Sequence, residues 1–346
     1  MSDTCSPTLP RAGLAATLTG LGFQSVGPGR TVEEDVRVGR HAHRISWCAP
    51  SMRTRVSVTV VHPSRDRAEE TLGLVFSELD RVVQLLNRHD GASAVSALNE
   101  RGVLHAPPEQ LSEVLRGAVE IHRLSGGAFD VTVKPLVDLL REWKAGDPMP
   151  DAELGEARSL VDMSALRITD RAVHLDKDGM GLTLDGIAKG YVVDRMAAVL
   201  RSGGVGSWLI DAGGDIRVSG HSDSGRPWRI GVQDPHKRGG FPDVIELRSG
   251  AVATSGGYED SFTADGTVHH VVDTFTGRSP VRTLSASVSA PTAMMADALA
   301  TTALVMEPRR AVSFIEALPR CACLLLGADG RRWRSRRWRT VSESHT

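Results

Sequence analysis

The sequence predicts an α+β fold, in which helices and strands are mixed along the chain without a strict alternation. Two amphipathic helical patterns dominate the first half, and a run of short strand patterns dominates the part after Pro148 and Pro150. A doubly wound parallel sheet would instead alternate strands with helices throughout. No repeat with a period of about 20–50 residues is visible. The chain of 346 residues can bury a large core, and its length suits one to three domains.

Apolar residues at helical spacing predict the helices. They follow one face from Arg67 to Leu86, as in an amphipathic helix. A second helix is expected from Pro108 to Ser125, closed by Gly126 and Gly127. The other expected helices are Ile187 to Leu200, Ala293 to Val305 and Phe314 to Ala317, with a short one over Leu14 to Leu21.

Alternating or continuous apolar runs predict the strands. Met52 to Val61 alternates, with its valines on one face. Ser207 to Ile210 and Asp215 to Ser219 flank Gly213-Gly214, which indicates a β-hairpin. The other expected strands lie within Ile168 to Leu175 and over Gly181 to Leu184, Trp228 to Val232, Val244 to Leu247, Ala251 to Thr254, Val268 to Val272, Ser285 to Ser289 and Ala322 to Leu326.

Composition narrows the class of function. The formal net charge is −1, so no global basic field argues for nucleic acid, and no partner of that kind is expected. No apolar stretch approaches the roughly 18 residues of a membrane span. The first 22 residues lack the basic and apolar regions of a signal peptide. The four cysteines are not spaced as zinc ligands and suit buried reduced thiols, so a cytoplasmic location is expected.

Residues 182–195, LTLDGIAKGYVVDR, are the most informative stretch. An apolar strand pattern leads into Asp185 and Gly186, followed by a helix that carries Lys189. Asp185 is expected to cap the helix, and Gly186 lets the backbone approach a ligand closely. A helix N-terminus with a lysine favours an anion such as phosphate, and only five of the 41 basic residues are lysines. An ordinary strand-to-helix junction is the alternative.

Two further patterns carry candidate chemistry. Asp297 and Thr301 are four residues apart in a predicted helix, so a carboxylate and a hydroxyl share one face and could bind Mg²⁺. The alternative is an exposed acid and a buried threonine on an amphipathic helix. His269 and His270 precede an Asp-initiated turn, and one of them could act as a general base. They are expected to point to opposite faces of a strand, so at most one should face a given site.

Three weaker patterns remain open. Ser255 to Tyr258 could offer backbone N–H groups to a ligand or form a plain turn. Asp130 follows a glycine turn and could accept a ribose or base hydrogen bond or cap its own turn. Arg331 to Arg339 holds six arginines and two tryptophans, which could bind an anionic surface. A terminal strand after the Asp329-Gly330 turn is the favoured interpretation.

In their order along the chain, these patterns resemble the FAD:protein FMN transferase family, the ApbE-type flavin transferases. The resemblance covers about residues 50 to 338. The matching stretches are Met52 to Thr54, Ala97 to Asn99, Gly127 to Val137, Asp185 to Asp194, Asp211 to Asp215, Trp228 to Pro235, Ala253 to Gly256, His270 to Gly277 and Ala296 to Thr301.

The resemblance implies a single α+β domain of two mixed lobes with FAD in the cleft between them. It divides the chain into an accessory segment, residues 1–44, and a flavin transferase domain, residues 45–340. It also implies transfer of FMN from FAD to a Thr or Ser hydroxyl of an acceptor protein, with Mg²⁺ bound and AMP released. By motif position, the implied base is His270, the FAD site is lined by Met52, Asp130, Lys189 and Val272, and the metal ligands are Asp297, Thr301 and the Gly186 carbonyl.

Departures from the family pattern fall on the expected rim of the cleft. Arg53 and Lys134 stand where glycine is common, and Thr274-Phe275 replaces the usual Pro-Arg. They concern the choice of acceptor more than FAD binding, and a cytoplasmic acceptor is expected. An FAD pyrophosphatase, in which water replaces the acceptor, and a non-catalytic flavin-binding protein are the alternative functions.

Overall fold

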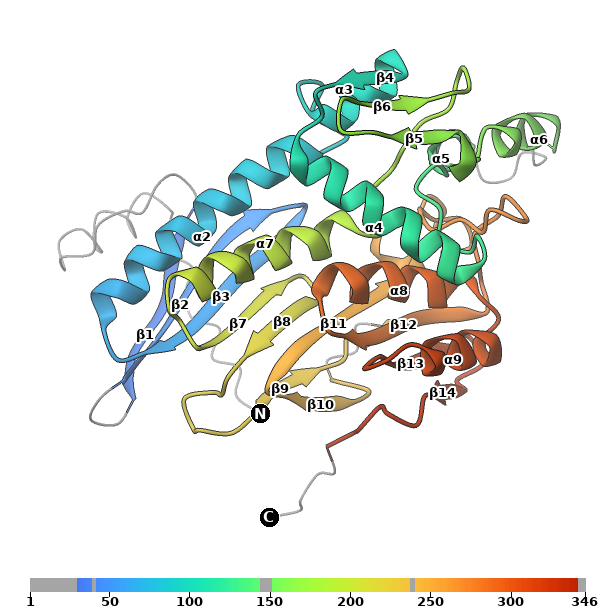
Figure 1. Cartoon of the computed structure of the whole chain (residues 1–346). Coiled ribbons are helices and arrows are strands. Elements are labelled where there is room, and N and C mark those ends of the chain that lie inside the picture. Colours follow the sequence, from blue (N-terminus) through green and yellow to red (C-terminus); the bar gives the residue numbers. More distant parts are fainter. Residues whose placement is uncertain (1–29, 39–41, 144–150, 237–239, 342–346) are drawn as a thin grey trace.

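A nine-stranded antiparallel sheet is the largest unit of the structure, a computed structural model that describes residues 30–38, 42–143, 151–236 and 240–341 (Figure 1). Neighbouring strands in this sheet pair in antiparallel registers throughout. Its order is β1 (Thr31–Val38), β2 (Ala42–Ser51), β3 (Thr54–His62), β7 (Ser207–Ala212), β8 (Asp215–Ser219), β11 (Ser249–Gly256), β12 (Thr283–Ala290), β13 (Ala322–Gly327) and β14 (Arg332–Arg334).

Helices cover one face of this sheet, where α2, α7, α4 and α8 form a layer (Figure 1). The main core lies between the two layers and includes Phe76, Leu115 and Trp208, each fully or almost fully buried. The helices are α2 (Arg65–Leu86), α3 (Ala94–Arg101), α4 (Glu109–Ser125), α5 (Lys134–Glu142), α6 (Asp151–Ser159), α7 (Ala188–Ser202), α8 (Ala293–Val305) and α9 (Pro308–Ala317), with 3-10 turns η1 (Met163–Ala165) and η2 (Gly257–Glu259).

The opposite face of the sheet has its own apolar cluster beneath the hairpin of β9 (Trp228–Gly231) and β10 (Val244–Leu247). Trp338, from the arginine-rich terminal segment, is buried in this cluster, and its indole N–H donates to Asp243 at 2.9 Å. As predicted, that segment forms a terminal strand, β14, paired with β13. Trp338 therefore anchors the segment to this apolar cluster.

A smaller part of the fold projects beyond the helical layer (Figure 1). It contains the three-stranded sheet β4 (Val103–His105), β6 (Ala172–Leu175) and β5 (Leu166–Ile168). Helices α5 and α6 pack together, and a third apolar cluster joins them to the loop around Val272. The mixture of antiparallel sheets and helices confirms the predicted α+β class and fits a single domain.

Two predicted strands are wrong. Over Gly181 to Leu184, Gly181 makes only an isolated bridge to Val133, and Leu182 bonds through its backbone to the Asn99 amide. Over Val268 to Val272, side-chain oxygens bond several of the backbone groups, such as His269 N–H to Ser279 Oγ at 2.9 Å. Side-chain hydrogen bonds replace the ladder in both places, from Asn99 to Leu182 and from Ser279 to His269.

The N-terminal boundary stays a prediction. Strand β1 and the start of β2 lie within the expected accessory segment, residues 1–44, and they pair with each other at the edge of the large sheet. The short helix expected over Leu14 to Leu21 lies outside the described residues. Over the part of the chain that is described, no helix combines the length and apolar character that crossing a membrane requires.

The contact between α7 and α8 depends on Gly190. A Cβ at this position would lie 2.3 Å from the Ala293 carbonyl oxygen and 2.8 Å from the Asp297 Cβ. We expect Gly190→Ala to lower the free energy of unfolding by about 1–3 kcal/mol, because overpacking a close helix contact forces backbone shifts. Urea unfolding measures this change. Gly155→Ala, in α6 with open space around its Cβ position, should leave stability unchanged or raise it.

Candidate active site

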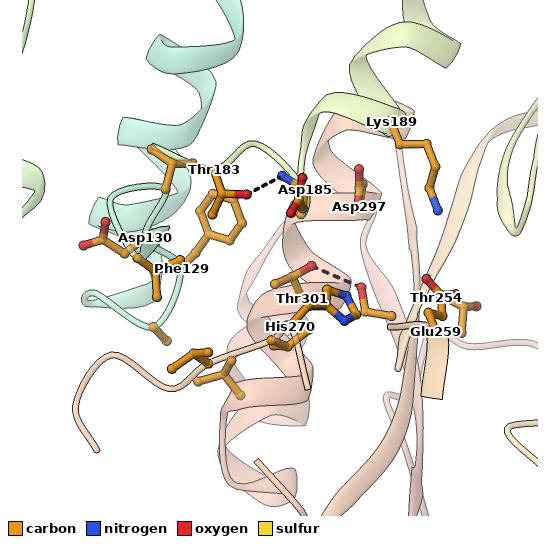
Figure 2. A pocket seen from close by; sticks show the side chains of 18 residues that line it. Phe129, Asp130, Thr183, Asp185, Lys189, Thr254, Glu259, His270, Asp297 and Thr301 are labelled. Carbon is orange, nitrogen blue, oxygen red and sulfur yellow. Dashed lines mark hydrogen bonds between the residues drawn. The ribbon is translucent and has the colours of Figure 1, made fainter. Parts of the chain in front are cut away.

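Two neighbouring cavities lie beside α7 and α8 and share four lining residues: Asp185, Lys189, Glu259 and His270. The larger one, of about 1190 Å³, extends to the turn between β2 and β3, where Met52 lines it. The smaller one, of about 70 Å³, is the pocket seen in Figure 2. The eight residues predicted for the site all line one or both cavities; the smaller cavity contacts all of them except Met52.

Asp297, Thr301 and Gly186, the three predicted metal ligands, all line the smaller cavity. Helix α8 begins after Thr292, whose hydroxyl accepts from Met295 N–H, and it places Asp297 and Thr301 one turn apart. A Cβ on Gly186 would lie 2.8 Å from Thr301 Oγ1, so the lack of a side chain lets this backbone approach the hydroxyl. Asp297 is 4 % exposed, so the alternative of an exposed acid is wrong. The Asp297 carboxylate accepts from Gly190 N–H at 3.0 Å.

A buried charge cluster adjoins these oxygens. Lys189 Nζ lies 3.5 Å from the Asp215 carboxylate, whose charge is the main cause of a raised lysine pKa. Burial raises the pKa of Asp215 to about 6, although Lys189 opposes the change. Burial, and then the charge of Asp215, raise the pKa of Asp297 well above its usual range. The one lysine thus faces two buried acids, and a further cation would stabilise their ionised forms.

His270 lies on the wall of the smaller cavity next to Thr301 (Figure 2). Its backbone N–H donates to the Asp260 carbonyl at 3.1 Å, and its Nδ1 lies 3.2 Å from the same oxygen. His269 is 3 % exposed, and its Nε2 bonds to the Pro280 carbonyl at 3.0 Å. Of these two neighbouring histidines only His270 lines the cavities, as expected, although the segment is a loop and not a strand.

Asp130 lines the smaller cavity with its carboxylate already engaged. Thr132 donates to it from its backbone N–H at 2.7 Å and from its hydroxyl at 2.6 Å. His122 Nδ1 lies 3.4 Å from its other oxygen. Asp130 thus caps its own turn, the alternative interpretation of this position. A contact between Asp130 and FAD stays a prediction.

The predicted cap at Asp185 is wrong. Helix α7 begins at Ala188 after Ile187, without a side-chain cap. The Asp185 carboxylate instead accepts from Arg88, with an ion pair of 2.8 Å, across 97 positions of sequence. Arg88 and Asp215 are site residues that the sequence interpretation missed. Asp215 stands in a recognisable motif after Gly213-Gly214, but the sequence does not show that it pairs with Lys189.

The donor set fits Mg²⁺ better than a softer metal. Within the described ranges, no three of His, Cys, Asp and Glu gather into a metal site. Mg²⁺ is usually bound by one or two carboxylates together with substrate phosphates and water. One carboxylate, one hydroxyl and one backbone carbonyl, at a buried acid cluster, match that preference.

Comparison with known proteins identifies the family. The ApbE family model matches residues 52–325, a stretch that contains all eight predicted site residues. The chain belongs to the ApbE family. The FAD:protein FMN transferase of Vibrio cholerae is 31 % identical over 292 residues, covering 80 % of this chain and 85 % of the relative. The FAD:protein FMN transferase of Treponema pallidum is 32 % identical, covering 78 % and 81 %.

Solved structures of ApbE proteins have the same fold. The flavin transferase ApbE from Vibrio cholerae superimposes with a TM-score of 0.75 at 28 % identity, over 85 % of this chain and 98 % of that structure. The ApbE protein from Thermotoga maritima gives the same TM-score and identity, with 85 % and 97 % covered. The ApbE fold therefore accounts for nearly the whole described chain.

Proposed function

We propose that this protein is an FAD:protein FMN transferase that attaches FMN to a Thr or Ser hydroxyl of an acceptor protein, with Mg²⁺ bound and AMP released. Membership of the ApbE family and the names of its relatives support the enzyme class. The observation that carries the detailed proposal is that one cavity is lined by the proposed metal ligands together with Lys189 and His270.

His270 has the geometry of a general base. A carbonyl oxygen only accepts hydrogen bonds, so the contact with Asp260 assigns the proton of the neutral ring to Nδ1 and leaves a lone pair on Nε2. In the proposed step, Nε2 takes the proton of the acceptor hydroxyl. The hydroxyl oxygen bonds to the FMN phosphorus, the pyrophosphate P–O bond breaks, and AMP leaves.

The remaining residues hold the phosphates. Lys189 stays charged beside Asp215 and offers its ammonium group to the pyrophosphate, and Asp297, Thr301 and Gly186 would hold Mg²⁺. When bound, Mg²⁺ neutralises charge on the phosphates as the bond breaks. Positioning and charge neutralisation are the main needs of phosphoryl transfer, and Lys189 and His270 both line the larger cavity, of about 1190 Å³, where we place FAD.

The deciding experiment incubates the protein with FAD and Mg²⁺, with and without a Thr-containing acceptor, and follows AMP and acceptor mass. An acceptor that gains FMN supports the transferase. AMP and free FMN at equal rates with and without acceptor would instead make it an FAD pyrophosphatase. Tight FAD binding without turnover, across a panel of acceptors, would favour a non-catalytic flavin-binding protein. A cytoplasmic acceptor stays a prediction.

Lys189→Met should weaken FAD binding by about tenfold to 100-fold, since a hydrogen bond to a charged group contributes about 1.5–3 kcal/mol. Titration calorimetry measures the FAD affinity, and thermal unfolding shows whether the buried acids tolerate the change. Lys189→Arg keeps the charge and should lose less. Lys177→Met, at a surface ion pair with Asp162, is the matched control. Equal FAD affinity in Lys189→Met and the control would contradict the phosphate role.

A further inference from the structure

Two arginines from distant parts of the chain meet at Asp260. Arg53 lies in the turn between β2 and β3, and its guanidinium is 3.4 Å from the Asp260 carboxylate. Arg141, near the end of α5, donates to the same oxygen at 3.0 Å and lies over the Phe262 ring at 4.6 Å. Arg53 and Asp260 both line the larger cavity. We call these three charged residues, Arg53, Asp260 and Arg141, the rim clamp.

The two arms of the rim clamp differ in strength. The Arg53 side chain is 69 % exposed, and exposed ion pairs contribute little. Arg141 is less exposed, and its contact with an aromatic face holds the guanidinium in place. Burial opposes ionisation of Asp260, yet the bond from Arg141 and the nearby charges lower its pKa. Arg141 is therefore the main arm.

Backbone geometry directs Arg53 to this place. Met52 and Arg53 have φ values of 50° and 61°, in the left-handed region, between the paired residues Ser51 and Thr54. Two successive left-handed residues make a tight hairpin turn. A non-glycine residue costs free energy in this conformation, and from this turn the Arg53 side chain reaches the Asp260 carboxylate.

The same residue, Asp260, also contacts the proposed base. Its carbonyl oxygen accepts from His270 N–H at 3.1 Å and lies 3.2 Å from His270 Nδ1. The carboxylate of Asp260 is thus held by the arginines while its carbonyl holds the imidazole. Movement of this one residue would change the orientation and the tautomer of His270.

We propose that Asp260 is a positioning residue for His270, and that Arg141 and Arg53 fix it so that Nε2 of His270 stays unprotonated and faces the acceptor. The catalytic consequence rests on the proposed function. The effect of the rim clamp on the His270 tautomer involves only residues of this chain, so it can be tested in the absence of turnover. It joins the β2–β3 turn, α5 and the loop after η2 beside the larger cavity, which Arg53 and Asp260 line.

The test compares Asp260→Asn and Arg141→Ala with Asp176→Asn, a control that breaks a surface pair with Arg167. Nitrogen-15 NMR of labelled histidines reports the tautomer of His270, assigned by the signal that His270→Gln removes. We expect both rim variants to shift the His270 nitrogens toward a mixture of tautomers, and the control to leave them unchanged. Arg53→Gly should cause a smaller shift than Arg141→Ala.

Transfer kinetics give the second measurement. We expect kcat to fall about five- to tenfold in Asp260→Asn, while the KM for FAD stays unchanged. The loss is only a part of the 100-fold or more that a general base contributes, because the base itself is still present. Unchanged nitrogen shifts and unchanged kcat in both folded rim variants would overturn the proposal. If the unmodified protein transferred no FMN, the proposed function would fail, while the nitrogen shifts would still decide whether Asp260 positions His270.

Discussion

Asp297→Ala should lower Mg²⁺-dependent turnover by about 100- to 1000-fold. It removes the only charged ligand of the proposed metal site, and the charge stabilisation that a metal gives is worth several kcal/mol. Asp297 is buried and its carboxylate accepts from Gly190 N–H, which fixes it on the wall of the cavity that Thr301 and Gly186 also line. AMP release measured over a Mg²⁺ titration gives the result.

Asp297→Asn separates charge from shape. The amide oxygen can still accept from Gly190 N–H, so the fold should be kept while Mg²⁺ affinity falls. Removing one of two neighbouring buried acids should also leave thermal stability equal or higher, because burial and Asp215 both oppose the Asp297 charge. Asp170→Ala, at a fully exposed acid, is the control. Full Mg²⁺-dependent activity in both Asp297 variants would reject the metal assignment.

The sequence predicts elements well where local pattern and packing agree. Helix α8 occupies the predicted range, because an Ala- and Leu-rich run between Thr292 and Met306 suits a helix that is buried on most sides. Helix α2 begins two residues before its predicted start, after Ser64, whose hydroxyl accepts from Arg67 N–H. In both helices the cap and the apolar face are encoded within a few residues.

Elements defined by distant partners escape such reasoning. Strand β1 carries charged residues and lies at the sheet edge, where its pairing with β2 makes it a strand. The pattern starting at Met52 looks like continuous strand, yet Met52 and Arg53 form a turn. Strand pairing and left-handed backbone conformations depend on residues that are neighbours in space. The alternation of apolar and polar side chains along the sequence carries no information about those neighbours.

The same distinction applies to the site. The i, i+4 spacing of Asp297 and Thr301 and the glycine at 186 predict a shared site, and all three residues line the smaller cavity. Their role as metal ligands stays a prediction. Asp185 has the sequence context of a helix cap, but Arg88, 97 positions away, takes its carboxylate. Resemblance to a family supplies the order of motifs, whereas ion pairs between distant residues, such as Arg141 with Asp260, become visible only in three dimensions.

His270→Ala should lower kcat for FMN transfer by about 100- to 10,000-fold, the usual contribution of a general base, and leave FAD affinity within about twofold, well under 1.4 kcal/mol. The ring lines both cavities and its Nδ1 bonds to the Asp260 carbonyl, which leaves Nε2 for the acceptor hydroxyl in the proposed step. Single-turnover transfer and FAD titration calorimetry separate the two effects.

The neighbouring histidine provides the matched control for this prediction. His269 bonds to Pro280 and lies outside both cavities, so His269→Ala should reduce stability more than the chemical step. His270→Gln retains a hydrogen-bonding side chain without a base and should be as slow as His270→Ala. A His270→Ala variant that loses FAD binding yet transfers normally at saturating FAD would make His270 a binding residue, and the base would then have to come from another group on the same wall, such as Asp185 or Glu259.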